Sequence, residues 1–282
     1  MKLANAPLAV QRARILKEVP PFRPVAVELL NLVSDISQPL ARMVALLRTD
    51  AVLTAEVLRL ANSPLIGCRS EIMNIMQALA FLGTERINSL IVTTAMRGLV
   101  GPGGGNLARA CWRHNLATAV ICERLAPTQH ISKERGYIAG LIHDIGRLAL
   151  LRAFPDYEEA LTQAAAEGRN LLAIEKGLYG MDHTEAGRWL LAQWGCPLDL
   201  QVVASLHENP AAAGGRDKNL VCLVGASSQL ADLMCFYAFD TQKADIAKVA
   251  EMLPEANSHL ANFPALTEFV ATRVNGIELS LS

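Results

Sequence analysis

AGLIHDIGRL, residues 139–148, is the stretch on which the interpretation of this chain depends. It places His143 and Asp144 next to each other inside an otherwise apolar run with helical spacing. An ionised carboxylate in apolar surroundings is costly unless a cation or several hydrogen bonds compensate its charge. A metal ion would supply that compensation. A simple hydrogen bond between the two side chains at a helix end is the alternative.

Other potential ligands lie in separate segments that read as helices with apolar or small neighbours: His114, His183, His207 and Asp232. Helices packed around one core could bring all of them to the His143-Asp144 pair. The sequence therefore predicts one shared site. Asp182 and His183 also fit a helix N-cap followed by the first turn, and that interpretation stays open.

The fold is predicted to be all-α, because apolar residues recur at helical rather than alternating spacing along the chain. Pro24 opens the first packed helix. The clearest break is GPGGG at residues 101–105. No Gly-Lys-Ser/Thr follows these glycines, so they indicate a connection between two lobes rather than a nucleotide-binding loop.

These patterns divide the chain into four parts. We expect an N-terminal leader at 1–16, a helical N-terminal lobe at 17–100, a second helical lobe at 106–240 and a C-terminal helical extension at 241–282. The segment 58–83 carries more apolar side chains than a lobe of about 80 residues buries alone. We therefore expect it to pack against the second lobe near the candidate site.

Composition excludes several classes of protein. The 282 residues are 51% hydrophobic, and 26 basic residues face 27 acidic ones, so the positive surplus typical of nucleic-acid binding is missing. Six cysteines without a C-x-x-C pair favour a reducing compartment. No secretory signal is recognisable, and Asp232 interrupts the longest apolar stretch, 220–239. The sequence thus predicts a cytoplasmic protein without membrane or nucleic-acid partners.

Several phrases together resemble the HDOD (HD-related output domain) family of bacterial signalling proteins. In the second lobe they are WRHN at 112–115, GLIHDIG at 140–146, DHTEAG at 182–187 and WGCPL at 194–198, and further phrases of the first lobe follow the family's order from Val19. The resemblance covers about residues 17–235. It implies a helical N-terminal lobe packed on an HD-like helical bundle, in regulatory proteins that commonly have no established reaction.

The resemblance also implies a ligand set. Metal-dependent HD phosphohydrolases use a histidine, a His-Asp pair and a later aspartate, which match His114, His143-Asp144 and Asp232. The related dinuclear HD-GYP enzymes use further histidines, matched here by His183 and His207. Nitrogen and oxygen ligands suit Fe, Mn, Zn or Ni, and a bridging Asp144 could hold two ions instead of one.

The chain departs from those enzymes at three points. Glu208 follows His207 and breaks the His-His pair, the Gly-Tyr-Pro motif is absent, and Arg147 replaces a lysine. An arginine can still clamp a phosphate bidentately, although it is a poorer proton donor.

Three functions follow. The chain is predicted to be a regulatory module that acts through a signalling protein partner or a phosphate-containing small ligand, with a metal bound in a degenerate HD site. The alternative is a metal-dependent phosphohydrolase that acts on a nucleotide or another phosphoester, with Arg147 near the phosphate. A helix-turn-helix over 40–60 is the weakest interpretation, because its second helix offers only Arg59 as a base.

Overall fold

The described part of the chain consists of helices and turns, without strands. The computed structural model describes residues 8–33, 40–64, 66–68, 70–101, 105–239 and 244–281. The prediction of an all-α fold is confirmed. A helix begins at Pro24 as expected, but it is not the first packed helix, because a helix at Leu8–Glu18 precedes it and packs on the second lobe. Of the glycine-rich break, residues 102–104 lie outside the described residues.

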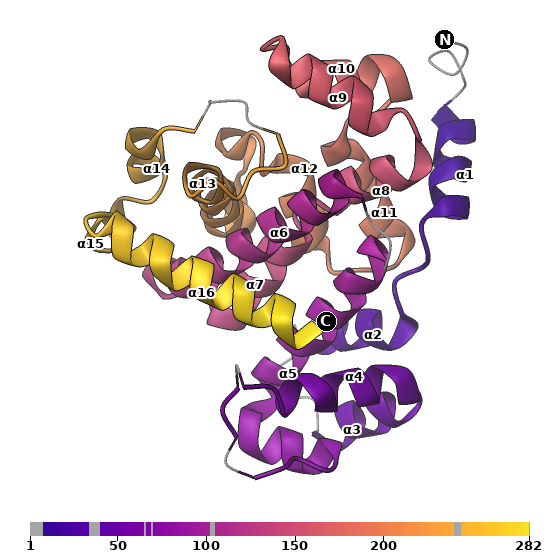
Figure 1. The fold of residues 1–282 in the computed structure, drawn as a ribbon, viewed down its shortest axis with the longest axis vertical. Helices are drawn as coiled ribbons and strands as arrows, with labels where there is room; N and C mark the ends of the chain where they lie inside the picture. The colour runs from indigo at the N-terminus through magenta and orange to yellow at the C-terminus, as the bar shows by residue number, and fades with distance from the viewer. Residues whose placement is uncertain are drawn as a thin grey trace.

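The first lobe is a small group of helices at the bottom of Figure 1. Its elements are α2 (Pro24–Val33), α3 (Leu40–Arg48), α4 (Ala51–Ala61) and the first part of α5 (Ile75–Val100). Gly83 interrupts α5 with φ 79° and ψ 166°, backbone angles that are essentially restricted to glycine. This kink lets the remainder of α5 leave α3 and α4 and run toward the second lobe.

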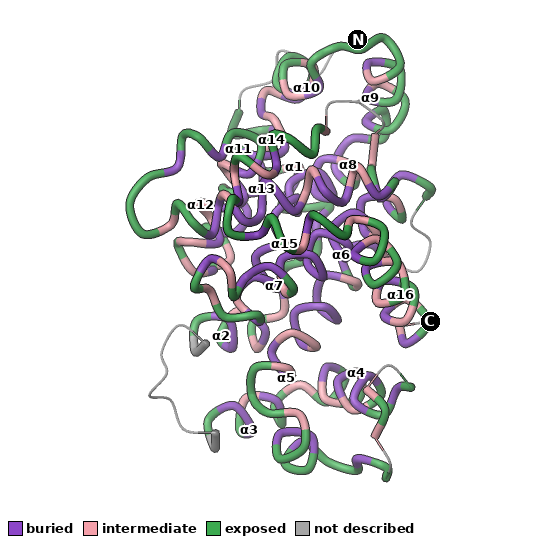
Figure 2. Tube along the Cα trace, turned by 90° about the vertical axis from the view of Figure 1, so that its left-hand side faces the viewer, coloured by how far each residue is buried: buried purple, intermediate pink, exposed green. Residues whose placement is uncertain are grey.

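The second lobe is built around α6, which is buried along most of its length (Figure 2). Its helices are α6 (Asn106–Leu125), α7 (Lys133–Ile142), α8 (Ile145–Ala153), α9 (Tyr157–Ala166), α10 (Leu171–Tyr179), α11 (His183–Gln193), α12 (Leu198–Leu206) and α13 (Lys218–Leu233). The chain continues through α14 (Ile246–Met252), α15 (Asn257–Leu260) and α16 (Phe263–Leu281). Helices α7, α13 and α16 all pack against α6. None of the described helices combines the length and apolar composition needed to cross a bilayer.

The two lobes are in direct contact, which confirms the prediction that an N-terminal helical lobe packs on an HD-like bundle. The rings of Phe22 and Trp194 stack with their centroids 5.3 Å apart, and the amide of Asn31 donates to the carbonyl of Gly195 at 3.0 Å. Helix α1 (Leu8–Glu18) packs on α8. Most of the segment that we assigned to a leader is therefore helical, with Ile15 fully buried.

The segment 58–83 reaches the second lobe at a different place from the one we expected. Its residues Leu60, Ile66 and Leu82 line a cavity together with side chains of α7 and α16. No residue of the segment lines the cavity that contains the predicted metal ligands. The reason is that α16 lies across α6 and reaches α4, so α16 and α7 cover the apolar side chains of the first lobe.

Candidate metal centre

The His143-Asp144 pair lies in a turn between α7 and α8, rather than within one continuous helix as the apolar run suggested. Asp144 leaves helical geometry with φ −103° and ψ 26°, and both side chains are buried. Next to the turn, Gly146 allows a close approach of α11. A Cβ atom at Gly146 would lie 1.9 Å from the carbonyl oxygen of His183. The absence of a side chain there thus places His183 beside Asp144.

His183 is held in place from two directions. It is the first residue of α11, whose start is fixed by a capping box between Asp182 and Glu185. Its backbone N–H donates to Oε2 of Glu175 at 2.9 Å, and its Nδ1 lies 2.7 Å from the same oxygen. A carboxylate that accepts from one ring nitrogen orients a histidine so that the other nitrogen can bind a metal. The cap and the ligand interpretations of this segment are therefore compatible.

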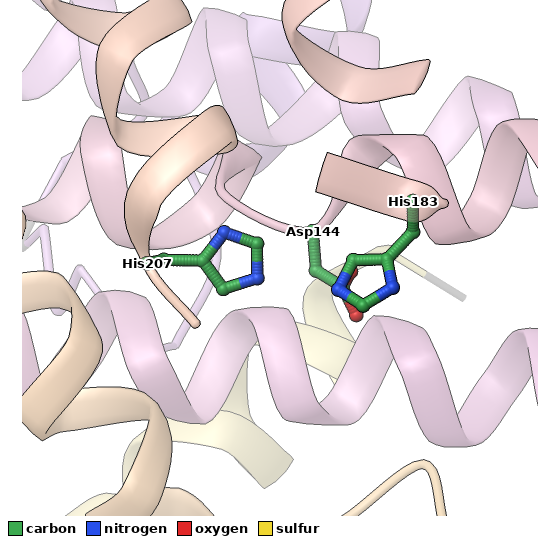
Figure 3. Close-up of side chains that lie close together, drawn as sticks. All are labelled: Asp144, His183 and His207. Carbon is green, nitrogen blue, oxygen red and sulfur yellow. The ribbon is translucent and has the colours of Figure 1, made fainter. Parts of the chain in front are cut away.

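Three buried side chains form a compact cluster of potential ligands: Asp144, His183 and His207 (Figure 3). Each offers one ligand atom, and these atoms all lie within 4.8 Å of one another. His207 follows α12 and places its Nδ1 3.1 Å from the carbonyl oxygen of Ala204, so Nδ1–H donates there and Nε2 stays available. One carboxylate and two imidazoles are a donor set that suits a divalent transition metal.

His143 lies beside this cluster without belonging to it. Its Nδ1 is 2.6 Å from the carbonyl oxygen of Gly140, whereas its buried Nε2 has no hydrogen-bond partner. Its ring lies 4.8 Å from that of His207, centroid to centroid. Burial, together with the nearby His207 and His114, holds the pKa of His143 well below its ordinary value. The imidazole is consequently neutral at physiological pH and can offer a lone pair.

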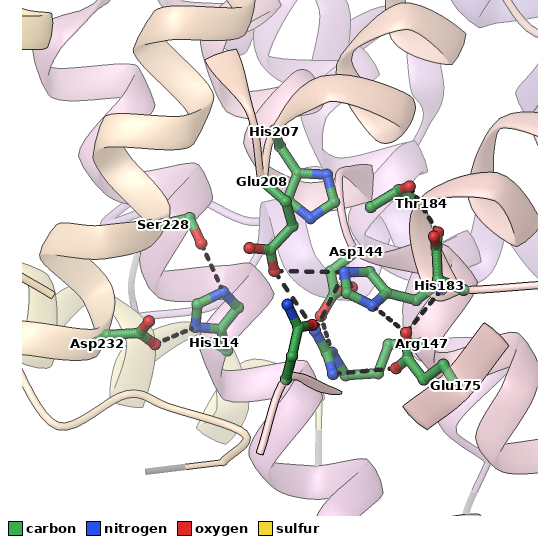
Figure 4. Close-up of polar contacts among 12 residues, drawn as sticks. His114, Asp144, Arg147, Glu175, His183, Thr184, His207, Glu208, Ser228 and Asp232 are labelled. Carbon is green, nitrogen blue, oxygen red and sulfur yellow. Dashed lines mark hydrogen bonds and ion pairs between the residues drawn. The ribbon is translucent and has the colours of Figure 1, made fainter. Parts of the chain in front are cut away.

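His114 and Asp232 face each other at one side of the site (Figure 4). Nδ1 of His114 lies 3.3 Å from Oδ1 of Asp232 and 2.7 Å from the carbonyl oxygen of Phe236, and Nε2 lies 3.1 Å from the hydroxyl of Ser228. Burial lowers the pKa of His114, but the hydrogen bond and charge of Asp232, the charge of Asp144 and the carbonyl of Phe236 together outweigh burial and raise the pKa. We expected Asp232 in the core, but 34% of its side chain is exposed, because it lies near the end of α13.

Arg147 is already bound by the carboxylates of the site. Its Nε donates to Oδ2 of Asp144 at 2.6 Å, and its Nη1 lies 3.5 Å from Oε1 of Glu175. Burial alone would raise the pKa of Asp144, but the charges of Arg147 and of the histidines outweigh burial and hold that pKa below its usual range. Asp144 is thus ionised, and its Oδ1 has no hydrogen-bond partner.

The charges around His183 favour its protonated form. Burial and Arg147 lower its pKa, but Glu175 and Asp144 outweigh them and raise the pKa of His183 to about 10. A metal ion that binds Nε2 would therefore replace a proton.

The candidate ligands line one cavity of about 350 Å³. It contains the six predicted ligands His114, His143, Asp144, His183, His207 and Asp232, and also Arg147. Whether each of them binds a metal, and whether Arg147 contacts a phosphate, stay predictions.

The sequence analysis missed two carboxylates of the site. Oε1 of Glu208 lies 3.4 Å from Nε2 of His183 and 3.8 Å from Nη2 of Arg147. Its position directly after His207 was a usable signal, although we took it only as a departure from a His-His pair. Glu175 is fully buried and accepts a hydrogen bond from the hydroxyl of Tyr157. Nothing in the local sequence distinguishes Glu175 from an exposed helical glutamate.

Comparison with known proteins identifies the family. The family model of the HDOD domain matches residues 19–210. A curated "Uncharacterized protein" of Treponema pallidum (strain Nichols) is 24% identical over 222 residues, which are 77% of this chain. The chain spans 43% of the length of that relative.

Two solved structures are similar over nearly the whole chain. A Shewanella amazonensis SB2B protein named "Putative phosphohydrolase" is 25% identical with a TM-score of 0.74, covering 99% of this chain and 100% of that one. A Marinobacter aquaeolei VT8 protein named "Putative signal transduction protein" is 19% identical with a TM-score of 0.74, covering 98% of this chain and 68% of that one. The match to the family model extends over more than half of the sequence, and the chain therefore belongs to the HDOD domain family.

Proposed function

We propose that this chain is a signal-transduction module whose HD-like cavity holds one divalent metal ion, and that it acts through contacts with a signalling protein. The observation that carries the proposal is the buried cluster of Asp144, His183 and His207, whose ligand atoms lie within 4.8 Å of one another. Fe, Mn, Zn and Ni all accept such ligands. The positive charge of a bound ion would hold the side chains of Asp144, His183 and His207 in one arrangement.

Two buried atoms support a cation at this place. Nε2 of His143 has no hydrogen-bond partner, and Oδ1 of Asp144 has none either, although Nε2 of His183 lies 3.6 Å from it. Buried polar atoms are normally hydrogen-bonded. The charges agree with one divalent ion. Asp144, Glu175 and Glu208 carry three negative charges against the one positive charge of Arg147 once His183 has lost its proton, and a divalent ion makes the sum zero.

Regulation is favoured over phosphoester hydrolysis by the state of two groups. Arg147, the predicted phosphate contact, is engaged by Asp144 and Glu175. His114 and Asp232, which a second ion would need, already pair with each other. Hydrolysis would require Arg147 to exchange a carboxylate for a substrate phosphate, so phosphohydrolase activity stays the alternative. The name of the Marinobacter protein agrees with a signalling role.

Metal content tests the first half of the proposal. We expect the full chain, purified without chelators or added metal, to contain about one divalent ion per chain by elemental analysis. Asp144→Ala should lose it, because the carboxylate of the cluster is gone. Asp156→Ala is the control, since Asp156 is exposed and its side chain makes no capping bond. Full metal content in Asp144→Ala would refute the site.

Turnover distinguishes the regulatory function from the phosphohydrolase alternative. We expect the metal-loaded chain to hydrolyse bis-p-nitrophenyl phosphate and cyclic di-GMP far more slowly than about 1 s⁻¹, the lower end of ordinary enzyme rates. Rates at or above that value, abolished in Asp144→Ala, would replace the regulatory function by the phosphohydrolase alternative.

A further inference from the structure

A second cavity, of about 250 Å³, lies where the first lobe meets α7 and α16. Its apolar wall consists of Leu60, Ile66, Leu82 and Leu90 of the first lobe and of Ile277 of α16, while α7 of the second lobe adds Tyr137 to the lining. In Figure 1 the end of α16 lies close to α5 and α4, at the junction of the two lobes. None of the predicted metal ligands lines this cavity, so it is separate from the metal centre.

Buried polar atoms in the lining indicate that the cavity is built to hold a ligand. The residue Glu134 is only 5% exposed, and its Oε1 has no hydrogen-bond partner. Ser63 is 7% exposed, and its hydroxyl is also unpartnered. An unpaired buried polar group is costly, and native proteins keep few of them. Two such atoms in one lining point to a polar group of a bound molecule.

The cavity opens into a basic basin. An adjoining hollow of about 420 Å³ shares Arg86, Glu123, Lys133 and Arg273 with it and adds Arg124. The described lining of the basin thus contains one carboxylate, Glu123, and four cationic side chains: Arg86, Arg124, Lys133 and Arg273. Glu123 is paired with Arg273 at 3.1 Å, so the other three cations face the basin without a matching acid in its own lining. The exposed Glu85 lies in the lining of the inner cavity. Such a surface attracts anions.

We propose that the cavity and the basin together bind a small amphipathic anion, with an apolar body between the lobes and a phosphate or carboxylate head on Arg86, Arg124 and Lys133. The apolar wall excludes a fully polar molecule from the inner cavity, and the basin excludes a purely apolar one. Because the lining of the cavity comes from both lobes, an occupant stabilises their present arrangement.

Glu134 is compatible with an anionic ligand. Burial, and then the neighbouring Glu85, raise the pKa of Glu134 to about 8. At neutral pH its carboxyl is therefore mostly protonated, does not repel an anion, and can donate a hydrogen bond to it.

Calorimetric titration of the full chain with hexyl phosphate tests this proposal. Hexanoate is the second probe, because it keeps the apolar body and replaces the head. Inorganic phosphate supplies the head alone and hexanol the body alone. We expect one of the two amphipathic anions to bind at least about tenfold more tightly than either half, a difference that titration resolves. The comparison between them shows which head the basin prefers.

Variants locate the binding. Leu90→Trp fills the inner cavity and Arg86→Gln removes a basin charge, and each should weaken binding by about tenfold or more. Ser89 also lines the cavity, and Ser89→Met is the second filling variant if Leu90→Trp does not fold. Arg109→Gln on α6 and Glu208→Gln at the metal centre lie outside the lining and should bind normally.

The proposal fails if neither amphipathic anion shows saturable binding at millimolar concentration, or if hexyl phosphate binds no better than inorganic phosphate and hexanoate no better than hexanol. It also fails if folded filling variants bind as the unchanged chain does. Removing the charge of Glu208 frees Arg147 and His183 from a competing carboxylate, so tighter binding in Glu208→Gln with normal binding in Arg86→Gln would place the anion at the metal centre instead.

Discussion

Glu175 is the residue on which the orientation of His183 depends, because it accepts from both the backbone and the ring of that histidine. Glu175→Gln removes the charge and weakens both contacts. We expect the affinity for the metal ion to fall by about 10–100-fold, the usual effect of losing a carboxylate behind a ligating histidine. Competition with a chromogenic chelator measures this change. Glu159→Gln, an exposed substitution on α9, should leave the affinity unchanged.

Glu134 should make the stability of the protein dependent on pH. Burial and Glu85 raise its pKa from 4.5 to about 8 in the folded chain, so the folded state holds the proton more tightly than the unfolded chain does. Its contribution to stability is therefore complete below about pH 4.5 and is lost as the pH rises through about 8, by as much as about 4 kcal/mol.

Urea unfolding at about pH 5 and about pH 9 measures this loss. Glu134→Gln cannot titrate and should lose less stability between these two pH values than the unchanged chain. Glu268→Gln, an exposed change on α16, should behave like the unchanged chain. An equal loss in all three proteins would assign the pH dependence to other groups.

At the residue scale, the sequence could predict the metal-type side chains but not their roles. His143 and Asp144 stood out because polar residues in an apolar run require a partner. In the structure, Asp144 and His183 belong to one cluster, whereas His114 pairs with Asp232. This division depends on how the histidine rings are oriented. The direction of the His114 ring is set by a carbonyl far away in the chain, that of Phe236, and that of His183 by the carboxylate of Glu175 on another helix.

Among the helices, the contact between α8 and α11 is the one that positions the metal centre. Gly146→Ala would place a Cβ atom 1.9 Å from the carbonyl oxygen of His183 and 2.5 Å from the backbone nitrogen of Gly187. Because both are backbone atoms, the helices must separate, and we expect a loss of more than about 2 kcal/mol of stability together with reduced metal content.

Gly177→Ala on α10 is the matched control for this experiment. A Cβ atom at Gly177 would meet nothing within 4 Å, so alanine should stabilise the helix by up to about 1 kcal/mol. Urea unfolding of both variants measures the difference. If Gly146→Ala were as stable as Gly177→Ala, the close approach of the two helices would not limit the site.

The helices themselves were readable from periodicity, whereas their interruptions were not. The run 139–148 contains no proline and keeps helical spacing across the turn at His143 and Asp144. The break exists because the two side chains have partners outside their own helices, which periodicity does not record. Gly83 is similar, since a single glycine in a helical run is compatible with either a continuous or a kinked helix.

The whole molecule should unfold as one unit. The first lobe packs on the second through the stacked rings of Phe22 and Trp194. Ile87 and Ile91 of α5 are fully buried. We expect fragment 1–100, expressed alone, to lack a cooperative thermal transition, because these apolar surfaces lose their cover. Circular dichroism and hydrogen exchange on both fragments, 1–100 and 106–282, test this. Unchanged protection in the separate fragment 1–100 would show that the lobes are independent.

Two contacts between the lobes cannot form until late in translation. They are the stacking of Phe22 on Trp194 and the hydrogen bond from Asn31 to Gly195. The second contact joins residues that are 164 positions apart. At a translation rate of about 5–20 residues per second, Gly195 is added on the order of 10–30 s after Asn31. During that time the surfaces of α1 and α2 that dock on the second lobe have left the ribosome without their partners. The nascent chain therefore exposes apolar docking surface until the residues directly after α11, Trp194 and Gly195, have emerged.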